Sequence, residues 1–237
     1  MERILKETAL EMGIAVDERA LSRFSQYYHV LLDWNKRMNL TAITEEEEVA
    51  KKHFLDSISP LTGQWIPQKA SLIDVGTGAG FPGIPLKIVR EDLKLTLLDS
   101  LQKRVNFLEE VTGVLGLTNI EIYHGRAEDY GRKAEFRGKF DIGVSRAVAE
   151  LPVLLELVLP FIKIGGLFIA YKGPGVFEEI EEGKKALELL GGRVEDILSV
   201  EIPGTDLKHY LTIVRKSKQT PTKYPRKAGK PERSPIK

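Results

Sequence analysis

The sequence predicts an α/β fold with a mostly parallel sheet and helices on both of its faces. From residue 71 onward, short apolar runs alternate with amphipathic stretches, as is typical of such folds. A glycine-rich turn follows the first apolar run. The expected strands lie near 72–75, 94–98, 119–123, 140–144 and 167–171, and the expected helices near 83–90, 101–115, 150–162 and 176–190. Two last strand-like runs, 194–202 and 210–215, are separated by a link too short for a helical crossover, which predicts an antiparallel hairpin.

The part of the chain before residue 65 is expected to be helical. Residues 2–12 and 17–35 carry apolar side chains at helical spacing, and Asp17 is a candidate cap for the second helix. Thr44 and Glu47 form a capping-box pattern for a third helix, which should continue to about residue 58. We therefore expect a helical extension over 1–65, an α/β domain over 66–215 and a tail over 216–237.

The tail differs in composition from the rest of the chain. Residues 215–237 hold nine Lys and Arg against one acid, a net charge of +8, which leaves −7 for residues 1–214 out of the total of +1. Four prolines lie among these bases, so the segment 216–237 is expected to be flexible. A basic tail on an acidic body indicates a polyanionic partner.

Composition also excludes several classes of protein. The chain has no cysteine, which excludes disulfides, thiolate zinc sites and a cysteine nucleophile. Its four histidines show no metal-ligand spacing, so no metal is expected. Charges occur throughout the first 25 residues and no run approaches 18 apolar residues, so neither a signal peptide nor a membrane span is expected. We expect a cytoplasmic protein.

The glycine-rich turn can be read in two registers. Gly78–Gly83 matches G-x-G-x-x-G, the dinucleotide fingerprint of nicotinamide oxidoreductases. Asp74–Gly80 matches acid-x-G-x-G-x-G, which resembles the first motif of class I S-adenosylmethionine-dependent methyltransferases. The second register fits better, because it puts Gly76 directly after the strand and leaves Asp74 where a carboxylate can face the methionine ammonium of that cofactor. In either register the turn, with Gly78 at its centre, lets a ligand approach the backbone closely.

The residues that follow the other strands are candidates for ligand binding, because ligands of such sheets lie beyond the carboxyl ends of the strands. Asp99 and Ser100 follow the second strand, where a carboxylate can accept both ribose hydroxyls of either cofactor. Ala127 and Glu128 follow the third strand, where an adenine edge would lie, although Glu128 could equally be a surface acid. Arg146 follows the fourth strand and could hold a phosphate, a base edge or the cofactor carboxylate, or form a salt bridge to a nearby acid.

The turn after the fourth strand also bears on the type of reaction. Ser145–Ala149 lacks the Asn-Pro-Pro-Tyr-like sequence that is usual in methyltransferases acting on exocyclic amines. Methylation of cytosine C5 needs a thiolate, and the chain has none. Ring-nitrogen and hydroxyl targets remain.

Taken together, the motifs resemble the bacterial small-subunit ribosomal RNA methyltransferase G family, also called glucose-inhibited division protein B. They are Asn39–Thr41, His53–Ser57, Asp74–Pro85, Gly125–Glu128, Ser145–Ala147 and Tyr224–Gly229. The resemblance implies a class I methyltransferase domain that transfers a methyl group from S-adenosylmethionine to N7 of a guanine in the 530 loop of 16S rRNA. By analogy, the cofactor would contact Gly76, Phe81, Ala127, Glu128 and Arg146.

Guanine N7 carries a lone pair and no proton, so no acid or base is assigned, and His53 is expected to be a structural helix residue. The expected partner is 16S rRNA or the small ribosomal subunit, and the protein is expected to be a monomer. The bases expected to contact RNA are Lys36, Arg37, Arg126, Lys172, Lys223, Arg226 and Lys227. Two alternatives are a nicotinamide-dependent oxidoreductase and a noncatalytic ribosome-binding assembly factor with a nucleotide pocket.

Overall fold

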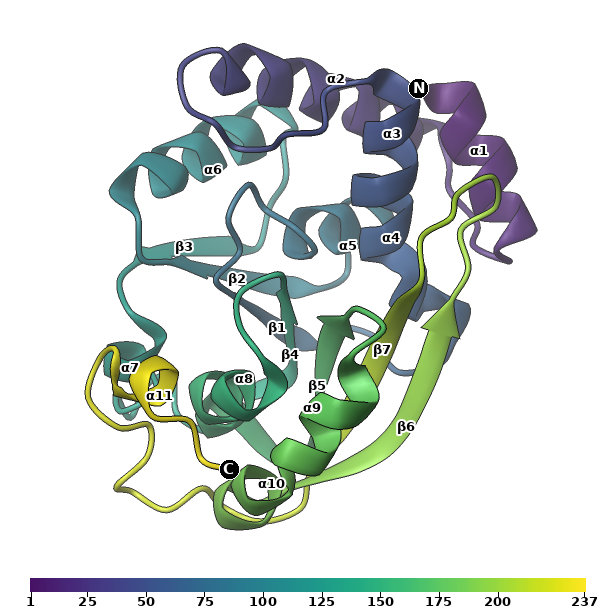
Figure 1. Ribbon diagram of the computed structural model, residues 1–237. Helices are drawn as coiled ribbons and strands as arrows, with labels where there is room; N and C mark the ends of the chain where they lie inside the picture. Colours follow the sequence, from purple (N-terminus) through teal and green to yellow (C-terminus); the bar gives the residue numbers. More distant parts are fainter.

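Seven strands form one sheet in the order β3-β2-β1-β4-β5-β7-β6 in the computed structural model, which describes residues 1–237 (Figure 1). The strands are β1 (Ser71–Val75), β2 (Lys94–Asp99), β3 (Ile120–His124), β4 (Phe140–Arg146), β5 (Ile162–Lys172), β6 (Gly192–Val200) and β7 (His209–Lys216). Strands β1 to β5 pair in parallel, and β7 runs antiparallel to both of its neighbours. The predicted fold class and its final hairpin are therefore confirmed.

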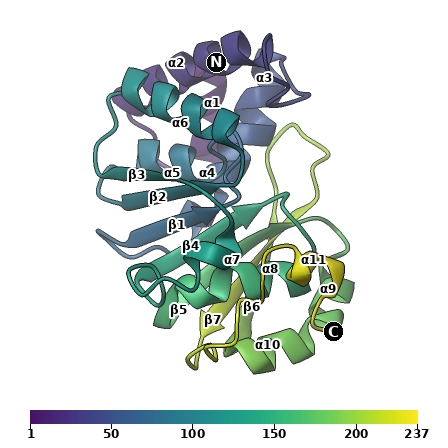
Figure 2. The ribbon, with the colours of Figure 1, turned by 90° about the vertical axis from the view of Figure 1, so that its left-hand side faces the viewer.

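The helices lie in two layers. Helices α1 to α6 gather on one side of the sheet and α8 to α10 on the other (Figure 2). They are α1 (Glu2–Glu11), α2 (Glu18–Asn35), α3 (Glu46–Val49), α4 (Asp56–Ile58), α5 (Gly83–Val89), α6 (Gln102–Val114), α7 (Ala127–Tyr130), α8 (Leu151–Val158), α9 (Val176–Glu182), α10 (Lys184–Leu190) and α11 (Lys230–Arg233). Reading the sequence missed the short helices α7 and α11.

Local signals identified some helix ends and not others. The Asp17 carboxylate accepts a hydrogen bond from the Ala20 amide at 2.7 Å, so the predicted cap of α2 is confirmed. The expected capping box at Thr44 is wrong, because α3 follows Glu45 and has no side-chain cap. A π-helical stretch, Ala50–Leu55, joins α3 to α4. The helix expected over 176–190 is divided into two at Gly183.

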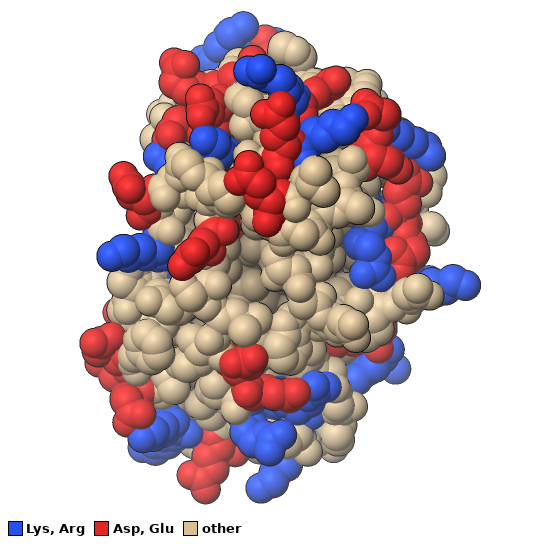
Figure 3. Space-filling view, turned by 90° about the vertical axis from the view of Figure 1, so that its right-hand side faces the viewer, with Lys and Arg blue, Asp and Glu red and all other residues tan.

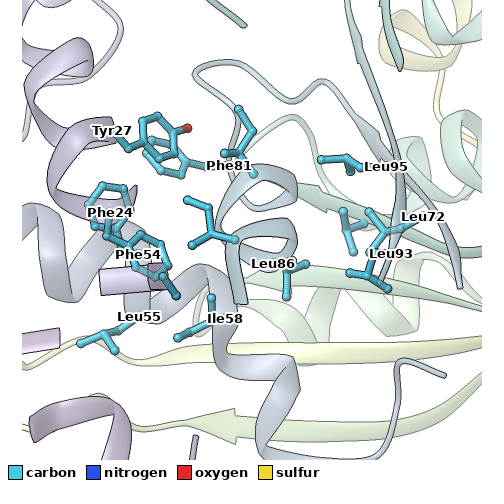
Figure 4. Packing of buried hydrophobic residues seen from close by; sticks show 14 of the residues in the cluster. Phe24, Tyr27, Phe54, Leu55, Ile58, Leu72, Phe81, Leu86, Leu93 and Leu95 are labelled. Atoms are coloured by element: carbon cyan, nitrogen blue, oxygen red, sulfur yellow. The ribbon is translucent and has the colours of Figure 1, made fainter. Parts of the chain in front are cut away.

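The helical extension shares a hydrophobic core with the sheet. One cluster of 37 buried residues includes side chains from α1, α2 and α4 together with residues of β1, β2 and α5. Figure 4 shows Phe24, Tyr27 and Phe54 of this extension beside Phe81 of the glycine-rich turn. Fully burying one such side chain stabilises a fold by about 1.5–3 kcal/mol, so the extension and the sheet stabilise one another.

The tail packs against the body, which differs from the flexibility expected from its composition. Tyr224 and Ile236 are buried in the hydrophobic cluster on the α8 side of the sheet. Arg137 donates hydrogen bonds to the Thr220 carbonyl at 2.7 Å and to the Tyr224 carbonyl at 2.8 Å. The two buried apolar side chains, and the hydrogen bonds that the tail carbonyls accept from Arg137, thus offset the electrostatic repulsion among the bases of the tail. No helix of the chain is both long and apolar enough to cross a membrane.

Candidate functional site

A pocket of about 620 Å³ lies at the carboxyl ends of the parallel strands, where the sequence predicts ligand binding. It is lined by the glycine-rich turn, the residues that follow β2 and β4, the extension and the start of β7. These residues are Leu40, Thr41, Ile43, Lys52, His53, Asp56, Gly76, Thr77, Gly78, Ala79, Phe81, Asp99, Ser100, Arg104, Arg146, Ala147, Val148, Leu207 and His209. Its size is in the range of small-molecule sites.

Two glycines let the turn approach a ligand closely. Gly76 and Gly78 have φ of 72° and 60°, a region that residues with a Cβ rarely adopt. A Cβ on Gly76 would lie 2.6 Å from Cγ2 of Val148, whereas a Cβ on Gly78 would have no atom within 4 Å. Backbone at Gly78 therefore borders open space in the pocket, where a ligand can lie against it.

Asp99 connects the turn to the end of β2. One carboxylate oxygen accepts from the Gly78 amide at 2.9 Å, and the other accepts from the Leu101 amide at 2.9 Å. Arg104 makes a longer contact of 3.5 Å. Because an ionised carboxylate has about four acceptor positions, Asp99 can also accept hydrogen bonds from a ligand in the pocket. Ser100 lies beside it in the pocket wall.

Asp74 is buried behind the turn and does not line the pocket. Its position therefore does not support the expected contact with the ammonium group of the cofactor. Its Oδ2 accepts from the Thr77 hydroxyl at 2.7 Å and from the Gly83 amide at 2.8 Å, while Oδ1 is buried without a partner. Burial raises the pKa of Asp74 from 3.8 to about 7, against the effect of these two hydrogen bonds. Asp74 therefore holds the turn to the first helical residue of α5.

The Asp74 pKa leads to a testable pH dependence. The folded-state pKa is above the unfolded value, so the stability tied to protonated Asp74 is full below about pH 4 and is lost as the pH rises through about 7. We expect the free energy of unfolding of the wild type, relative to that of Asp74→Asn, to fall between about pH 4 and pH 7 at up to about 1.4 kcal/mol per pH unit, and to level off at higher pH. Urea denaturation of both proteins at each pH measures this, and parallel pH profiles would contradict it.

Aromatic side chains of the extension hold Phe81 at the end of the turn. The Phe81 ring stacks on Tyr27 at 5.4 Å and on His53 at 4.9 Å between centroids. Tyr27 also donates a hydrogen bond to the Ala79 carbonyl. Burial and the Arg146 charge lower the pKa of His53 to about 4, and both of its ring nitrogens have partners, the Thr41 hydroxyl and the Lys52 carbonyl. His53 is thus placed as a neutral structural residue, which is the role expected for it.

Arg146 takes part in a buried charge network that reading the sequence did not find. Its Nη1 contacts Oδ2 of Asp56 at 2.5 Å, and His209 Nδ1 lies 2.9 Å from Oδ1 of the same carboxylate. Asp56 is fully buried, and the Arg146 guanidinium lies over the Phe81 ring at 5.0 Å. Nε and Nη2 of Arg146 make no hydrogen bond within the chain, so they are available to a ligand. The salt bridge considered for Arg146 exists, and it leaves the ligand-binding role open.

The structure brings most of the predicted cofactor residues together. Gly76, Gly78, Phe81, Asp99, Ser100 and Arg146 all line the pocket. Ala127 and Glu128 do not, and Glu128 instead accepts a hydrogen bond from the Gly229 amide of the tail at 2.7 Å. The Glu128 carboxylate therefore holds the tail. This role differs from both roles considered for it, an adenine contact and a surface acid.

Two of the predicted RNA-binding bases are engaged within the protein. Lys172 contacts Glu179 at 2.6 Å with a side chain only 9% exposed, and Arg226 contacts the buried Glu156 at 2.6 Å. Neither acid was recognised as a partner from the sequence. Contact of Lys172 and Arg226 with RNA stays a prediction. The other five bases are exposed: Lys36, Arg37, Arg126, Lys223 and Lys227. On the face drawn in Figure 3, basic side chains are interspersed with acidic ones.

The sheet order, the glycine turn after β1 and the acid at the end of β2 define a class I methyltransferase fold. A solved S-adenosylmethionine-dependent methyltransferase from Aquifex aeolicus shares this fold with a TM-score of 0.53 at 22% identity, over 73% of this chain and 94% of the other. TYW2 of M. jannaschii, solved in complex with AdoMet, aligns with a TM-score of 0.54 at 16% identity, over 74% of this chain and 79% of the other.

The chain belongs to the rRNA small subunit methyltransferase G family, whose model matches residues 20–208. A protein of Alkaliphilus oremlandii named ribosomal RNA small subunit methyltransferase G is 50% identical over 237 residues, which cover 100% of this chain and 99% of the relative. One of Clostridium botulinum (strain Loch Maree / Type A3) with the same name is 53% identical over 234 residues, covering 99% and 98%. The chain is thus a methyltransferase, and the nicotinamide oxidoreductase alternative is not supported.

Proposed function

We propose that the chain transfers the methyl group of S-adenosylmethionine to N7 of a guanine in the 530 loop of 16S rRNA. Full-length similarity to the methyltransferase G family supports this, together with the pocket at the family's glycine turn. The observation that carries it is the pairing of open backbone at Gly78 with the Asp99 carboxylate, which hydrogen-bonds that same backbone.

The residues present fit this cofactor. The backbone at Gly76 and Gly78 would hold it closely, and the free acceptor positions of Asp99 would bind its ribose hydroxyls. The unpaired Nε and Nη2 of Arg146 suit the cofactor carboxylate. When bound, the cofactor supplies an electrophilic methyl group on a sulfonium.

The chemistry does not require a general base. Guanine N7 offers an in-plane lone pair, so the chain needs only to align the base behind the methyl carbon. Alignment is worth up to about 7–11 kcal/mol in ideal cases. His53, the histidine nearest the turn, has both ring nitrogens engaged and is neutral, in keeping with a reaction that moves no proton.

RNA phosphates are proposed to contact the five exposed bases, Lys36, Arg37, Arg126, Lys223 and Lys227. Each phosphate contact by Lys or Arg releases counterions, so RNA binding should weaken as salt rises. Lys36 and Arg37 share Asp33 as a partner on the protein, and exposed pairs of this kind contribute little, so both can turn to RNA.

Transfer to unmethylated 16S rRNA and to unmethylated small subunits tests the function directly. With tritium-labelled S-adenosylmethionine, we expect label on one guanine of the 530 loop. Reduction and aniline treatment should then cleave the RNA at that guanine, because N7 methylation weakens the glycosidic bond. Binding of rRNA without transfer would instead support the noncatalytic assembly factor. Label at another atom or another loop would contradict the proposed target.

A further inference from the structure

The pocket is wider than the part that the cofactor-binding residues occupy. Asp99 ends β2, the glycine turn follows β1, and His209 begins β7. In the sheet order, β1, β4 and β5 lie between β2 and β7, and at about 4.8 Å per strand this spacing spans about 19 Å. With the nucleoside at β1 and β2, the end of the pocket beside β7 is left for the methyl acceptor.

His209 offers an unused hydrogen-bond acceptor at that end. Its Nδ1 lies 2.9 Å from Oδ1 of Asp56. Burial raises the pKa of Asp56, but the hydrogen bond from His209 and the Arg146 charge outweigh burial, so the net pKa is lowered and Asp56 is ionised. Because a carboxylate only accepts hydrogen bonds, Nδ1 must carry a proton, and in the tautomer with a single ring proton the lone pair is on Nε2.

Nothing in the chain uses that lone pair. His209 Nε2 has no hydrogen-bond partner, and the His209 side chain is 31% exposed and lines the pocket. Leu207 and Val148 line the pocket as well, and Val148 is 39% exposed. An oriented acceptor in a pocket with apolar lining is what a planar base with donors on its edge requires.

We propose, on the basis of the proposed function, that His209 recognises the target guanine by accepting a hydrogen bond from its Watson–Crick edge, N1–H or the 2-amino group. These donors lie on the six-membered ring, on the far side of the purine from N7. A guanine held by this edge at the β7 end therefore directs N7 back toward the glycine turn. Adenine presents an N1 acceptor at the corresponding position, so the Nε2 lone pair would repel it.

Substitution of His209 separates base recognition from cofactor binding. We expect His209→Ala to lower kcat/KM for rRNA by about ten- to a hundredfold, because a donor of the bound base loses its partner. The dissociation constant of S-adenosylhomocysteine should change by less than about twofold, since truncation leaves Arg146 paired with Asp56. His209→Gln, which carries an acceptor oxygen at a similar reach, should recover part of the loss. His29→Ala, an exposed histidine on α2, is the matched control.

A second measurement does not depend on how well the variant folds. RNA with adenine in place of the target guanine should be a poor substrate of the wild type, and the guanine-to-adenine ratio of kcat/KM should fall at least about tenfold in His209→Ala. An unchanged ratio, or an equal loss of S-adenosylhomocysteine affinity, would overturn this role for His209. Wild-type protein that does not methylate the guanine would refute the proposed function itself, so the two failures are distinguishable.

Discussion

Replacing Asp99 with alanine should weaken the binding of S-adenosylhomocysteine by about a hundredfold or more. The Asp99 carboxylate is only 2% exposed and holds the Gly78 and Leu101 amides at 2.9 Å each. Its loss leaves these amides without a partner and removes the proposed acceptor for the ribose hydroxyls. Each hydrogen bond that a ribose hydroxyl loses costs about 1–3 kcal/mol, so the loss of two such bonds accounts for the expected hundredfold change in the dissociation constant. Isothermal titration calorimetry measures the dissociation constant.

Two control variants locate the effect. Asp99→Asn keeps the shape and one acceptor oxygen, so its affinity should lie between those of the wild type and Asp99→Ala. Arg104→Ala removes only the 3.5 Å contact of a side chain that is 40% exposed, and it should change the affinity by less than about fivefold. An unchanged dissociation constant in Asp99→Ala would exclude Asp99 from the site.

Much of the fold could be predicted because it depends on short-range patterns. The alternation of apolar runs after residue 71 placed the seven strands, and the short link after residue 202 placed the antiparallel pair. Segments whose structure depends on tertiary contacts were predicted less well. The π-helical stretch Ala50–Leu55 carries no local signal, and Arg146, far along the chain, contacts its Lys52 and His53 carbonyls at 3.4 Å each.

The residues of the site likewise fall into those that short-range patterns predicted and those that depend on tertiary contacts. Residues next to a strand end, such as Gly78 and Asp99, were predicted because the topology alone brings strand ends together. The pairing of Asp56 with His209 joins residues 153 apart in the chain, and no spacing rule connects them. Spacing rules for metal ligands or catalytic triads do not detect this pair, because the two residues meet only when β7 pairs antiparallel with β5.

The tail shows the limit of arguments from composition. Its net charge and prolines are typical of flexible segments, but the segment also carries the large apolar side chains of Tyr224 and Ile236. Both are buried, and Arg226 meets an acid that lies 70 residues earlier in the chain. A segment predicted to bind RNA as a free arm is therefore largely fixed to the α8 side of the sheet, although its bases other than Lys216 and Arg226 are exposed.

Replacing Arg226 with alanine should lower the free energy of unfolding by about 3 kcal/mol. Its Nε and Nη2 contact the two oxygens of Glu156 at 2.9 and 2.6 Å, and its amide donates to the first oxygen at 2.7 Å. The Glu156 side chain is 1% exposed and that of Arg226 is 20% exposed. Truncation leaves a buried carboxylate without its counter-charge, which typically costs about 3–5 kcal/mol. We expect the lower end of this range because the Arg226 side chain is partly exposed. Urea denaturation measures the change in the free energy of unfolding.

Lys227→Ala is the matched control, because Lys227 is the next residue, is exposed and makes no ion pair, so its stability should lie within about 0.5 kcal/mol of the wild type. The double variant Arg226→Met with Glu156→Leu removes both charges and should recover much of the lost stability. Most of the destabilisation in Arg226→Ala comes from the buried Glu156 carboxylate left without a counter-charge, rather than from loss of the attraction within the pair. If Arg226→Ala is as stable as Lys227→Ala, Glu156 does not hold the tail in solution. The buried side chains of Tyr224 and Ile236 and the hydrogen bonds from Arg137 would then be what fixes the tail.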